Sequence, residues 1–194
     1  ALAASKLLIP VAHVEAGLRS FNMAMPEEQN RILTDHISKY LFAPTDTAVD
    51  NLKNEGISSN VHNVGDVMYD AILHFSSLAR EKSKVLEKYN LADADYILAT
   101  IHRAENTDKM ERLKNIIEAF NLSGKKIVLP LHPRTKKCAD NYGLKFSSNV
   151  ILIDPVGYLD MVMLELHSLK IVTDSGGVQK EAYFLSKPCI TLRD

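Results

Sequence analysis

Short apolar runs along the chain alternate with longer segments in which apolar residues recur every three or four positions. Short runs rich in β-branched residues are typical of buried parallel strands, and the wider spacing is typical of helices with one buried face. We expect strands at 9–14, 40–43, 60–64, 96–101, 126–131, 150–153, 169–172 and 189–192. We expect helices at 26–38, 45–52, 68–89, 109–120 and 158–166, a short helix after Arg134, and a helix from 178 to about 185.

Local signals support the first two helices. Pro26 suits a first helical position, and Thr45 suits a helix cap because its hydroxyl can accept a hydrogen bond from the first turn. In the helix at 26–38, the spacing predicts that Ile32, Leu33 and Ile37 face inward.

Strands that alternate with helices throughout predict an α/β chain with parallel sheets. There are two such series, which we assign to two Rossmann-like domains at 1–70 and 71–194, connected by the helix at 68–89. The chain starts in what reads as the tail of a helix and stops at Asp194, directly after a strand. We therefore expect a fragment that is cut at both ends. Residues 1–70 would be the C-terminal part of the first domain, and residues 71–194 would be a second domain that is incomplete at its end.

Composition excludes several classes of function. Hydrophobic residues make up 46% and charged residues 24%, as in an ordinary globular protein, and the net charge of −1 offers no general attraction to nucleic acid or an anionic membrane. No apolar run approaches the roughly 20 residues of a spanning helix. Cys138 and Cys189 belong to no ligand-spaced cluster, so we interpret them as reduced structural thiols of a cytoplasmic protein without a metal site.

Polar side chains follow five of the predicted strands. In an open α/β sheet, ligands bind beyond the carboxyl ends of the strands, so these residues point to a shared cleft, although each alone could simply cap a helix or pair with a neighbour. The residues are Glu15, His102, Arg103, His132, Arg134, Asp154, Asp174 and Ser175.

The turn Ser175-Gly176-Gly177 joins a strand to a helix and is suited to hold a phosphate. Glycines let the backbone approach an anion, and the first-turn N–H groups have no helical partner. The dipole contributes only about 0.3–2 kcal/mol, whereas micromolar binding needs about 8 kcal/mol, so more contacts are required. The candidate additional donors are Arg103, His132, Arg134 and the hydroxyl of Ser175. The alternative is a turn that needs glycine for its geometry alone.

Three glutamates add candidate chemistry. Glu181 lies two turns into the helix and could accept hydrogen bonds from ribose hydroxyls, or it could be a solvated helix charge. Glu15 and either Glu27 or Glu28 could act as acids or bases on whatever the nucleotide carries, although Glu27 or Glu28 could instead serve the helix N-terminus. His102 could transfer a proton or donate to a leaving phosphate. The dinucleotide fingerprint and the P-loop are both absent from the sequence.

Eight segments, spread over nearly the whole chain, resemble the non-hydrolysing UDP-N-acetylglucosamine 2-epimerase family. They are HVEAGLRS (13–20), MPEEQNRILTDH (25–36), LFAPTDTA (41–48), VGDVMYDA (64–71), HRAEN (102–106), LHPRT (131–135), DPVGYLD (154–160) and TDSGGVQKEA (173–182). The resemblance implies two Rossmann-like domains facing a cleft (the GT-B fold), a homodimer and no cofactor. It also implies reversible epimerisation at C2 of UDP-N-acetylglucosamine to UDP-N-acetylmannosamine, by UDP elimination to 2-acetamidoglucal and re-addition, in the supply of N-acetylmannosamine units for cell-surface polysaccharide.

The resemblance also implies roles for individual residues. Family catalytic groups match Glu15, Glu27 and His102, and UDP-binding residues match Ser175, Gly176, Gly177 and Glu181. Bacterial members are activated by a second substrate molecule beside the active site, and Arg103 and His132 are our candidates for that contact. A third family carboxylate, an aspartate, belongs upstream of residue 1, and family segments are also expected after residue 194. We therefore expect these 194 residues alone to lack activity.

Several alternatives stay open. A hydrolysing relative would release UDP and free N-acetylmannosamine, and a related epimerase would act on a modified sugar such as a diacetamido uronate. A glycosyltransferase would share the fold and the nucleotide site, but the carboxylates at positions 15 and 27 favour elimination over transfer. A catalytically silent UDP-sugar sensor is the remaining class.

Overall fold

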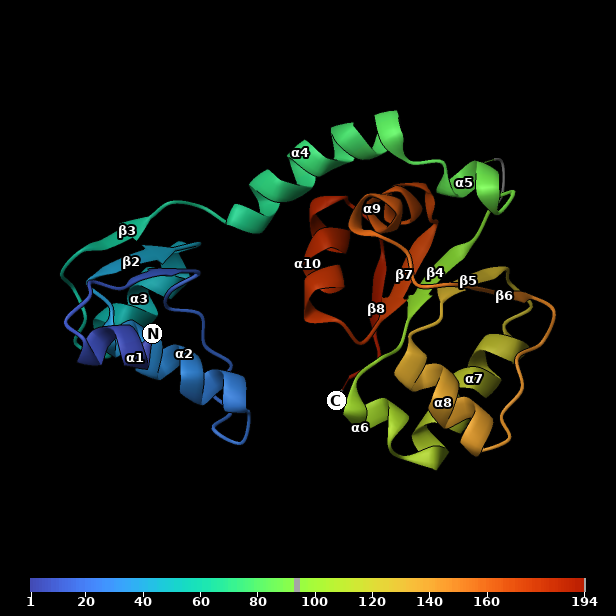
Figure 1. Ribbon diagram of the computed structural model, residues 1–194, viewed down its shortest axis with the longest axis horizontal. Helices are drawn as coiled ribbons and strands as arrows, with labels where there is room; N and C mark the ends of the chain where they lie inside the picture. The colour runs from blue at the N-terminus through green and yellow to red at the C-terminus, as the bar shows by residue number, and fades with distance from the viewer. Residues whose placement is uncertain (93–94, 194) are drawn as a thin grey trace. The chain divides into compact units, whose positions relative to one another are not determined.

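The computed structural model describes residues 1–92 and 95–193, which form two compact units, 1–70 and 71–194 (Figure 1). Asp194, at which the sequence ends, lies outside the described residues. Each unit contains a parallel β-sheet with helical connections, so the predicted α/β class is confirmed. No helix in the described ranges is long and apolar enough to cross a membrane.

Unit 1 has a three-stranded parallel sheet in the order β1-β2-β3. Its elements are α1 (Leu2–Lys6), β1 (Ala12–Val14), α2 (Pro26–Ile37), β2 (Tyr40–Ala43), α3 (Asp46–Asn54) and β3 (Val61–Asn63). The predicted cap of α3 is confirmed, since the Thr45 hydroxyl accepts a hydrogen bond from the amide of Ala48 at 3.1 Å. The apolar core is small, with Leu41 and Leu52 completely or almost completely buried.

The buried face of α2 differs from the prediction. Leu33 is 62% exposed, whereas Glu28 and Asp35 are buried. Glu28, Ile32 and Asp35 lie at helical spacing on one face, and that face takes charged groups because their hydrogen-bond partners lie in the loop after β1. The expectation that Leu33 faces inward is therefore wrong for this chain.

Unit 2 has a five-stranded parallel sheet in the order β6-β5-β4-β7-β8. Its strands are β4 (Ile97–Thr100), β5 (Ile127–Pro130), β6 (Val150–Ile153), β7 (Lys170–Thr173) and β8 (Cys189–Thr191). Its helices are α5 (Val85–Lys88), α6 (Ala104–Thr107), α7 (Met110–Leu122), α8 (Pro133–Asn141), α9 (Tyr158–His167) and α10 (Gly176–Phe184), while α4 (Val67–Lys82) begins just before the boundary between the units.

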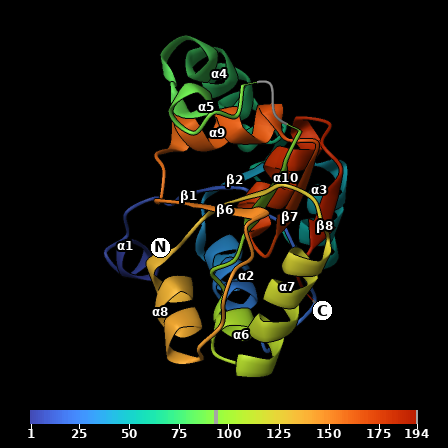
Figure 2. The ribbon, with the colours of Figure 1, turned by 90° about the vertical axis from the view of Figure 1, so that its right-hand side faces the viewer.

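The sheet of unit 2 is covered on both faces, as Figures 1 and 2 show. Alternate residues of a strand point to opposite faces, so Leu98 packs in the core beneath α5, α9 and α10, while its neighbour Ala99 packs beneath α7 and α8. In β7, Ile171 likewise packs on the side of α5, α9 and α10, and Val172 packs on the side of α7 and α8. Burial on both faces explains why these strands read as continuous apolar runs.

The helix predicted at 68–89 is two helices, because α4 ends at Lys82 and α5 begins at Val85. The Ser83 hydroxyl lies 2.5 Å from a carboxylate oxygen of Asp160 and also accepts the amide of Val85 at 3.3 Å. The change of direction lets Val85 and Leu86 enter the core of unit 2. Spacing alone could not show this break, because Ser83 and Lys84 are compatible with a continuous helix.

Candidate functional site

The order of strands in unit 2 places the ends of β4 and β7 side by side. The chain runs outward from β4 to β5 and β6, and then returns to the other side of β4 to form β7 and β8. Thr100 and Thr173 are register partners at the ends of these two central strands. The segments His102-Arg103 and Asp174-Ser175 therefore leave the sheet at its topological switch point, where open α/β sheets bind ligands.

Asp174 is the anchor of this edge. Its side chain is completely buried and accepts the backbone amides of His102 and Arg103, each at 3.0 Å, and the side-chain amide of Asn106 at 3.1 Å. Burial alone would raise the pKa of this carboxyl group, but its hydrogen bonds lower the pKa to about 2. Asp174 is therefore ionised at neutral pH and can only accept hydrogen bonds.

His102 is oriented by Asp174. The Nδ1 atom of the imidazole lies 3.2 Å from Oδ1 of Asp174, and because the carboxylate only accepts, Nδ1 carries the proton. The Nε2 atom is then the atom that can exchange a proton with a ligand. The side chain is 41% exposed, so a ligand can reach it.

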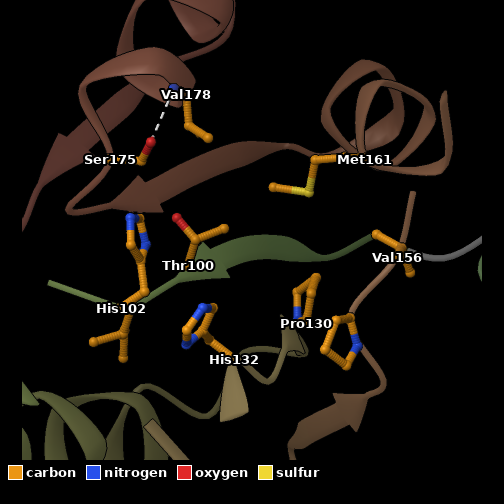
Figure 3. A pocket seen from close by; sticks show the side chains of 10 residues that line it. Thr100, His102, Pro130, His132, Val156, Met161, Ser175 and Val178 are labelled. Carbon is orange, nitrogen blue, oxygen red and sulfur yellow. Dashed lines mark hydrogen bonds between the residues drawn. The ribbon is translucent and has the colours of Figure 1, made fainter. Parts of the chain in front are cut away.

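A cavity of about 210 Å³ opens at this edge of the sheet (Figure 3). His102, His132 and Ser175 line it, and the two imidazole rings lie with their centroids 5.8 Å apart. Its remaining wall is mainly apolar and comes from the ends of three strands and from α9 and α10, through Thr100, Ile101, Pro130, Pro155, Val156, Met161 and Val178. An apolar cavity with a few convergent polar groups is typical of a small-molecule site.

The N-terminus of α10 borders the cavity. The Ser175 hydroxyl caps the helix by accepting the amide of Val178 at 3.4 Å, and Gly176 and Gly177 form the first helical positions. Gly176 has an ordinary backbone conformation, and a Cβ atom placed on it would lie 4.0 Å from the guanidinium of Arg103. The turn therefore does not need glycine at 176 for its geometry. The small residue instead leaves open backbone beside a cation, as an anion site requires.

The two basic groups that follow β5 differ in their availability. Nδ1 of His132 accepts the amide of Arg134 at 3.2 Å, which leaves its Nε2 as the donor on the cavity wall. The guanidinium of Arg134 instead binds both carboxylate oxygens of Asp108, at 2.6 and 2.7 Å. Arg134, which the sequence offered as a phosphate donor, is therefore occupied by an ion pair.

Glu181 is not a solvated helix charge. It is 7% exposed, and the phenol of Tyr158 donates a hydrogen bond to its carboxylate at 2.8 Å. It lies one helical turn beyond Val178, which lines the cavity. Sequence reasoning missed its neighbour Glu165, which is completely buried on α9, because a single glutamate in an apolar helix carries no signal of its role.

In unit 1, the two glutamates proposed as catalytic occupy different settings. Glu15 follows β1 with its backbone in the left-handed region, at φ 66°, and its side chain is half-buried. Glu27 is exposed on the first turn of α2. The neighbouring Glu28 is completely buried and accepts the backbone amides of Ser20 and Phe21 at about 3 Å. Glu28 therefore has a structural role, but it supports the loop before α2 and not the helix N-terminus that we considered for Glu27 or Glu28.

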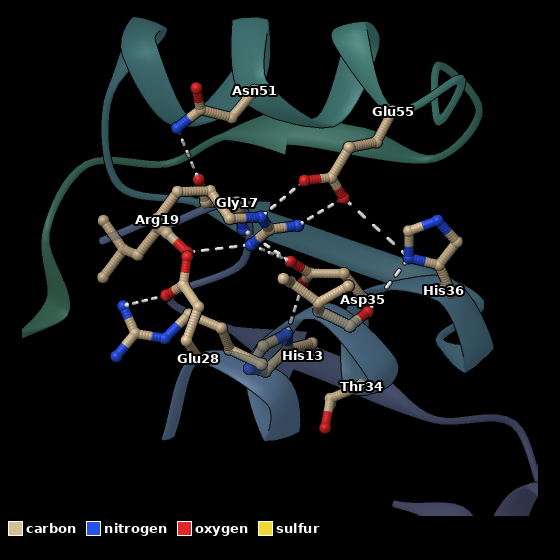
Figure 4. Close-up of polar contacts among 12 residues, drawn as sticks. His13, Gly17, Arg19, Glu28, Thr34, Asp35, His36, Asn51 and Glu55 are labelled. Carbon is tan, nitrogen blue, oxygen red and sulfur yellow. Dashed lines mark hydrogen bonds and ion pairs between the residues drawn. The ribbon is translucent and has the colours of Figure 1, made fainter. Parts of the chain in front are cut away.

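A buried ionic network supports the loop that follows Glu15 (Figure 4). Asp35 accepts the amide of Gly17 at 3.1 Å and the guanidinium of Arg19 at 2.7 Å, and it lies 2.5 Å from Nδ1 of His13. Arg19 also binds both oxygens of Glu55, at 2.6 and 2.7 Å. The pKa of Asp35 is lowered by these partners, although burial acts in the opposite direction. Losing one partner of such a buried pair typically costs about 3–5 kcal/mol.

Sequence reasoning missed this network. The helix was predicted to bury Ile32, Leu33 and Ile37, so Asp35 was not expected on its buried face, although its partners His13 and Arg19 stood in the motif that precedes that helix. Among the described residues, no cluster of three or more His, Cys, Asp or Glu side chains could hold a metal ion.

Comparison with known proteins decides the family. The family model described as UDP-N-acetylglucosamine 2-epimerase matches residues 1–194. The chain belongs to the UDP-N-acetylglucosamine 2-epimerase family.

Two relatives illustrate the range within this epimerase family. The chain is 60% identical over 199 residues to a UDP-N-acetylglucosamine 2-epimerase homolog of Methanococcus maripaludis, covering 100% of the chain and 56% of the relative. It is 55% identical over 201 residues to UDP-2,3-diacetamido-2,3-dideoxy-D-glucuronate 2-epimerase of Pseudomonas aeruginosa, covering 100% of the chain and 54% of the relative. The chain thus spans about half the length of the curated epimerases that it matches.

Solved epimerase structures agree with the fold. The UDP-GlcNAc 2-epimerase of Methanocaldococcus jannaschii, solved in complex with UDP-GlcNAc and UDP, matches with a TM-score of 0.88 at 51% identity. That match covers 100% of this chain and 56% of the solved one. These neighbours have the GT-B fold, which confirms the fold class expected for this epimerase-family chain.

Proposed function

We propose that the whole protein binds a UDP-linked N-acetylhexosamine and inverts its C2 centre, interconverting UDP-N-acetylglucosamine and UDP-N-acetylmannosamine. The observation that carries this proposal is the grouping of His102, its partner Asp174 and the N-terminus of α10 around one cavity. Family membership supports the choice of substrate class, since relatives with this name are 53% and 47% identical to the chain.

The nucleotide is proposed to bind at the switch point of unit 2. The diphosphate would lie on the backbone of Ser175, Gly176 and Gly177, where the helix N-terminus and the guanidinium of Arg103 both favour negative charge. The buried carboxylate of Glu181 would accept hydrogen bonds from the ribose hydroxyls. His132 would donate through Nε2, either to this nucleotide or, with Arg103, to an activating second substrate molecule.

The proposed reaction is an elimination followed by an addition. The hydrogen at C2 of the sugar is not acidic, so simple removal and return of that proton is too slow. A carboxylate would instead remove the C2 proton while the C1–O bond breaks, giving 2-acetamidoglucal and UDP. The nucleotide would then add back to C1 as a proton reaches C2 from the opposite face.

Separate groups would serve the two ends of this reaction. Glu15 and Glu27 are proposed to transfer the C2 proton, a contribution of about 10²–10⁴-fold in rate. As the imidazolium, which the Asp174 carboxylate would stabilise, His102 would donate its Nε2 proton to the departing phosphate oxygen. The helix N-terminus would retain UDP between the two steps, so that the nucleotide is available for re-addition.

Proton NMR of UDP-N-acetylglucosamine in heavy water, with the whole protein as catalyst, tests this proposal. We expect deuterium at C2 together with a growing UDP-N-acetylmannosamine signal. Free UDP with free N-acetylmannosamine would instead identify a hydrolysing enzyme. A spectrum that stays unchanged would overturn both reactions.

A second candidate substrate is a UDP-linked diacetamido uronate. The Pseudomonas aeruginosa relative that carries this substrate in its name is 55% identical to the chain. Both substrates would be compared in the same NMR assay, at equal concentration. A faster exchange at C2 of the uronate would assign the protein to that reaction and would leave the proposed nucleotide site unchanged.

The setting of the protein is also proposed from the family resemblance. It would act as a cytoplasmic homodimer that supplies N-acetylmannosamine units for cell-surface polysaccharide, with no cofactor. Light scattering of the whole protein tests the assembly, and a monomeric mass would contradict it.

A further inference from the structure

Glu165 is a buried acid to which the proposed reaction gives no role. It lies on α9 with no solvent exposure, and among the described residues neither of its carboxyl oxygens has a hydrogen-bond partner, while Glu181 is the acidic side chain that acts on it. An ionised carboxylate is strongly disfavoured in such a place. Burial and the neighbouring Glu181 raise the pKa of Glu165 to about 9, so it carries a proton at neutral pH.

Glu181, the other glutamate of this pair, is held as a hydrogen-bond acceptor. The phenol of Tyr158 donates to Oε1 of Glu181 at 2.8 Å, which marks that carboxylate as an acceptor. Burial and the Glu181 carboxylate both raise the pKa of Tyr158, so the phenol keeps its proton. Glu165 is therefore the member of the pair that holds a proton, next to a carboxyl group that accepts from Tyr158.

Each glutamate of the pair lies one helical turn beyond a residue that lines the cavity, Glu165 beyond Met161 and Glu181 beyond Val178. Glu181 is one turn beyond Val178 on α10, and Tyr158 is one turn before Met161 on α9, while Val178 and Met161 both line the cavity (Figure 3). A group that controls the direction of the Glu181 carboxylate therefore controls what the edge of the cavity can bind.

We propose that Glu165 is a positioning residue, a neutral acid whose O–H group donates to Glu181 and, with Tyr158, directs that carboxylate toward the ribose hydroxyls of the nucleotide. This inference rests on the proposed role of Glu181 as the ribose acceptor. Two donors from different side chains fix the plane of a carboxylate better than one, and the remaining lone pairs are left for the ligand.

The neutral state of Glu165 also matters for a substrate that is itself an anion. If both glutamates were ionised, the second negative charge would repel the diphosphate and also its own neighbour. The other titratable groups under the influence of Glu165 are Tyr158 on α9 and Cys189 on β8, and the pKa of the Cys189 thiol is also raised, first by burial and then by Glu165. Both groups are neutral at pH 7, so neither supplies a compensating charge.

Binding of UDP and of 2′-deoxyuridine 5′-diphosphate to the whole protein, measured by calorimetry, tests this role. We expect the natural protein to prefer UDP by about tenfold or more, because a hydrogen bond to a charged acceptor would be lost with the deoxy nucleotide. The variant Glu165→Gln retains a neutral donor and should keep that preference. The variant Glu165→Leu fills the buried site without a donor and should lower the preference to roughly threefold or less.

The outcomes separate this inference from the function on which it rests. If Glu165→Leu keeps the full preference for UDP, Glu165 does not position the acceptor. If the natural protein binds both nucleotides equally, Glu181 is not the ribose acceptor, and this inference falls while the UDP site stands. If the natural protein binds neither nucleotide, the proposed function falls as well.

A second measurement covers the case in which Glu165→Leu does not fold. The infrared spectrum of the natural protein at neutral pH should contain the carbonyl band of a protonated carboxylic acid, and that band should be absent in Glu165→Gln. No such difference between the two spectra would mean that Glu165 is ionised, which would overturn the inference directly.

Discussion

The Nδ1 atom of His102 lies 3.2 Å from Oδ1 of Asp174, a side chain with no solvent exposure. The same carboxylate accepts the backbone amides of His102 and Arg103, so one buried group fixes both the ring and the segment that carries it. Asp174 therefore has two separable effects, one on the stability of unit 2 and one on the imidazole.

Replacing Asp174 by asparagine should reduce both the stability of unit 2 and the effect of this side chain on the His102 imidazole. The pKa of this carboxyl group falls from 3.8 to about 2 on folding, which corresponds to stabilisation on the order of 2 kcal/mol above pH 4. Because the folded-state pKa is the lower one, this contribution is lost as the pH falls from about 4 to about 2. Urea unfolding of the natural chain across that range should show the loss, and Asp174→Asn should lack it.

Activity of the whole protein is the second readout for this variant. Asparagine cannot hold the imidazole as an ionised acceptor does, so turnover should fall by about 10²-fold or more. Asp108→Asn is the matched control, since Asp108 pairs with Arg134 on the surface. An Asp174→Asn enzyme with natural turnover would exclude the proposed role of the His102–Asp174 pair.

Glu165 should make the stability of unit 2 depend on pH in the opposite sense. Its pKa rises from 4.5 to about 9 on folding, so between these values the folded state holds a proton that the unfolded state has lost. Stability should therefore decline as the pH rises through this window, with a slope of up to about 1.4 kcal/mol per pH unit. Chemical unfolding between pH 5 and 8 should show a flatter profile for Glu165→Gln.

The exposed Glu118, which pairs with Lys114, provides the control for that measurement. Glu118→Gln should retain the natural pH profile. Equal slopes for the natural chain and Glu165→Gln would mean that the buried acid does not bind its proton in this range.

Gly176→Ala should weaken UDP binding without lowering the stability of the fold. A methyl group at 176 meets no atom closer than 4.0 Å and the backbone there is ordinary, so stability should be unchanged or rise by about 0.4–1 kcal/mol. The methyl would stand between the helix N-terminus and Arg103, and UDP affinity should fall about tenfold or more.

Gly124→Ala should give the reverse pattern. Gly124 has φ 63°, a conformation that costs an alanine about 1–2 kcal/mol, and it follows α7. Thermal unfolding and UDP calorimetry on both variants make the comparison. Natural UDP affinity in Gly176→Ala would remove this helix N-terminus from the proposed phosphate site.

Glu27 and Glu28 offer a matched pair of neighbouring substitutions. Glu27 is exposed, so Glu27→Gln should change stability by less than about 0.5 kcal/mol while epimerisation falls by about 10²–10⁴-fold. Glu28 is buried, and its pKa is lowered by the amides of Ser20 and Phe21, although burial opposes this shift. Glu28→Gln should therefore cost about 1–3 kcal/mol in unfolding free energy.

Steady-state rates of the whole protein and urea unfolding distinguish the two glutamates. A stable Glu27→Gln enzyme that turns over at the natural rate would rule out Glu27 as a proton-transfer group, and an unaffected stability in Glu28→Gln would contradict the supporting role described for it.

Sequence patterns were sufficient for the strands and for the edge of the sheet at which the cavity opens, because strands buried on both faces are encoded by local apolar runs such as 96–101. They failed where a choice depends on distant partners. Asp35, not Leu33, is buried because Arg19 and His13 bind its carboxylate. No pattern within α2 contains that information. The division between α4 and α5 likewise depends on Asp160, more than seventy residues away.

The left-handed backbone of Glu15, at φ 66°, implies that thermal stability and catalytic turnover favour different residues at this position. A non-glycine residue in this conformation costs on the order of 1 kcal/mol, and asparagine tolerates it better than glutamate does. Selection of variants for heat resistance alone should therefore enrich Glu15→Asn. Each variant selected in this way would lack a proposed proton-transfer group. Laboratory evolution of this protein should accordingly screen for exchange at C2 as well as for survival of heating.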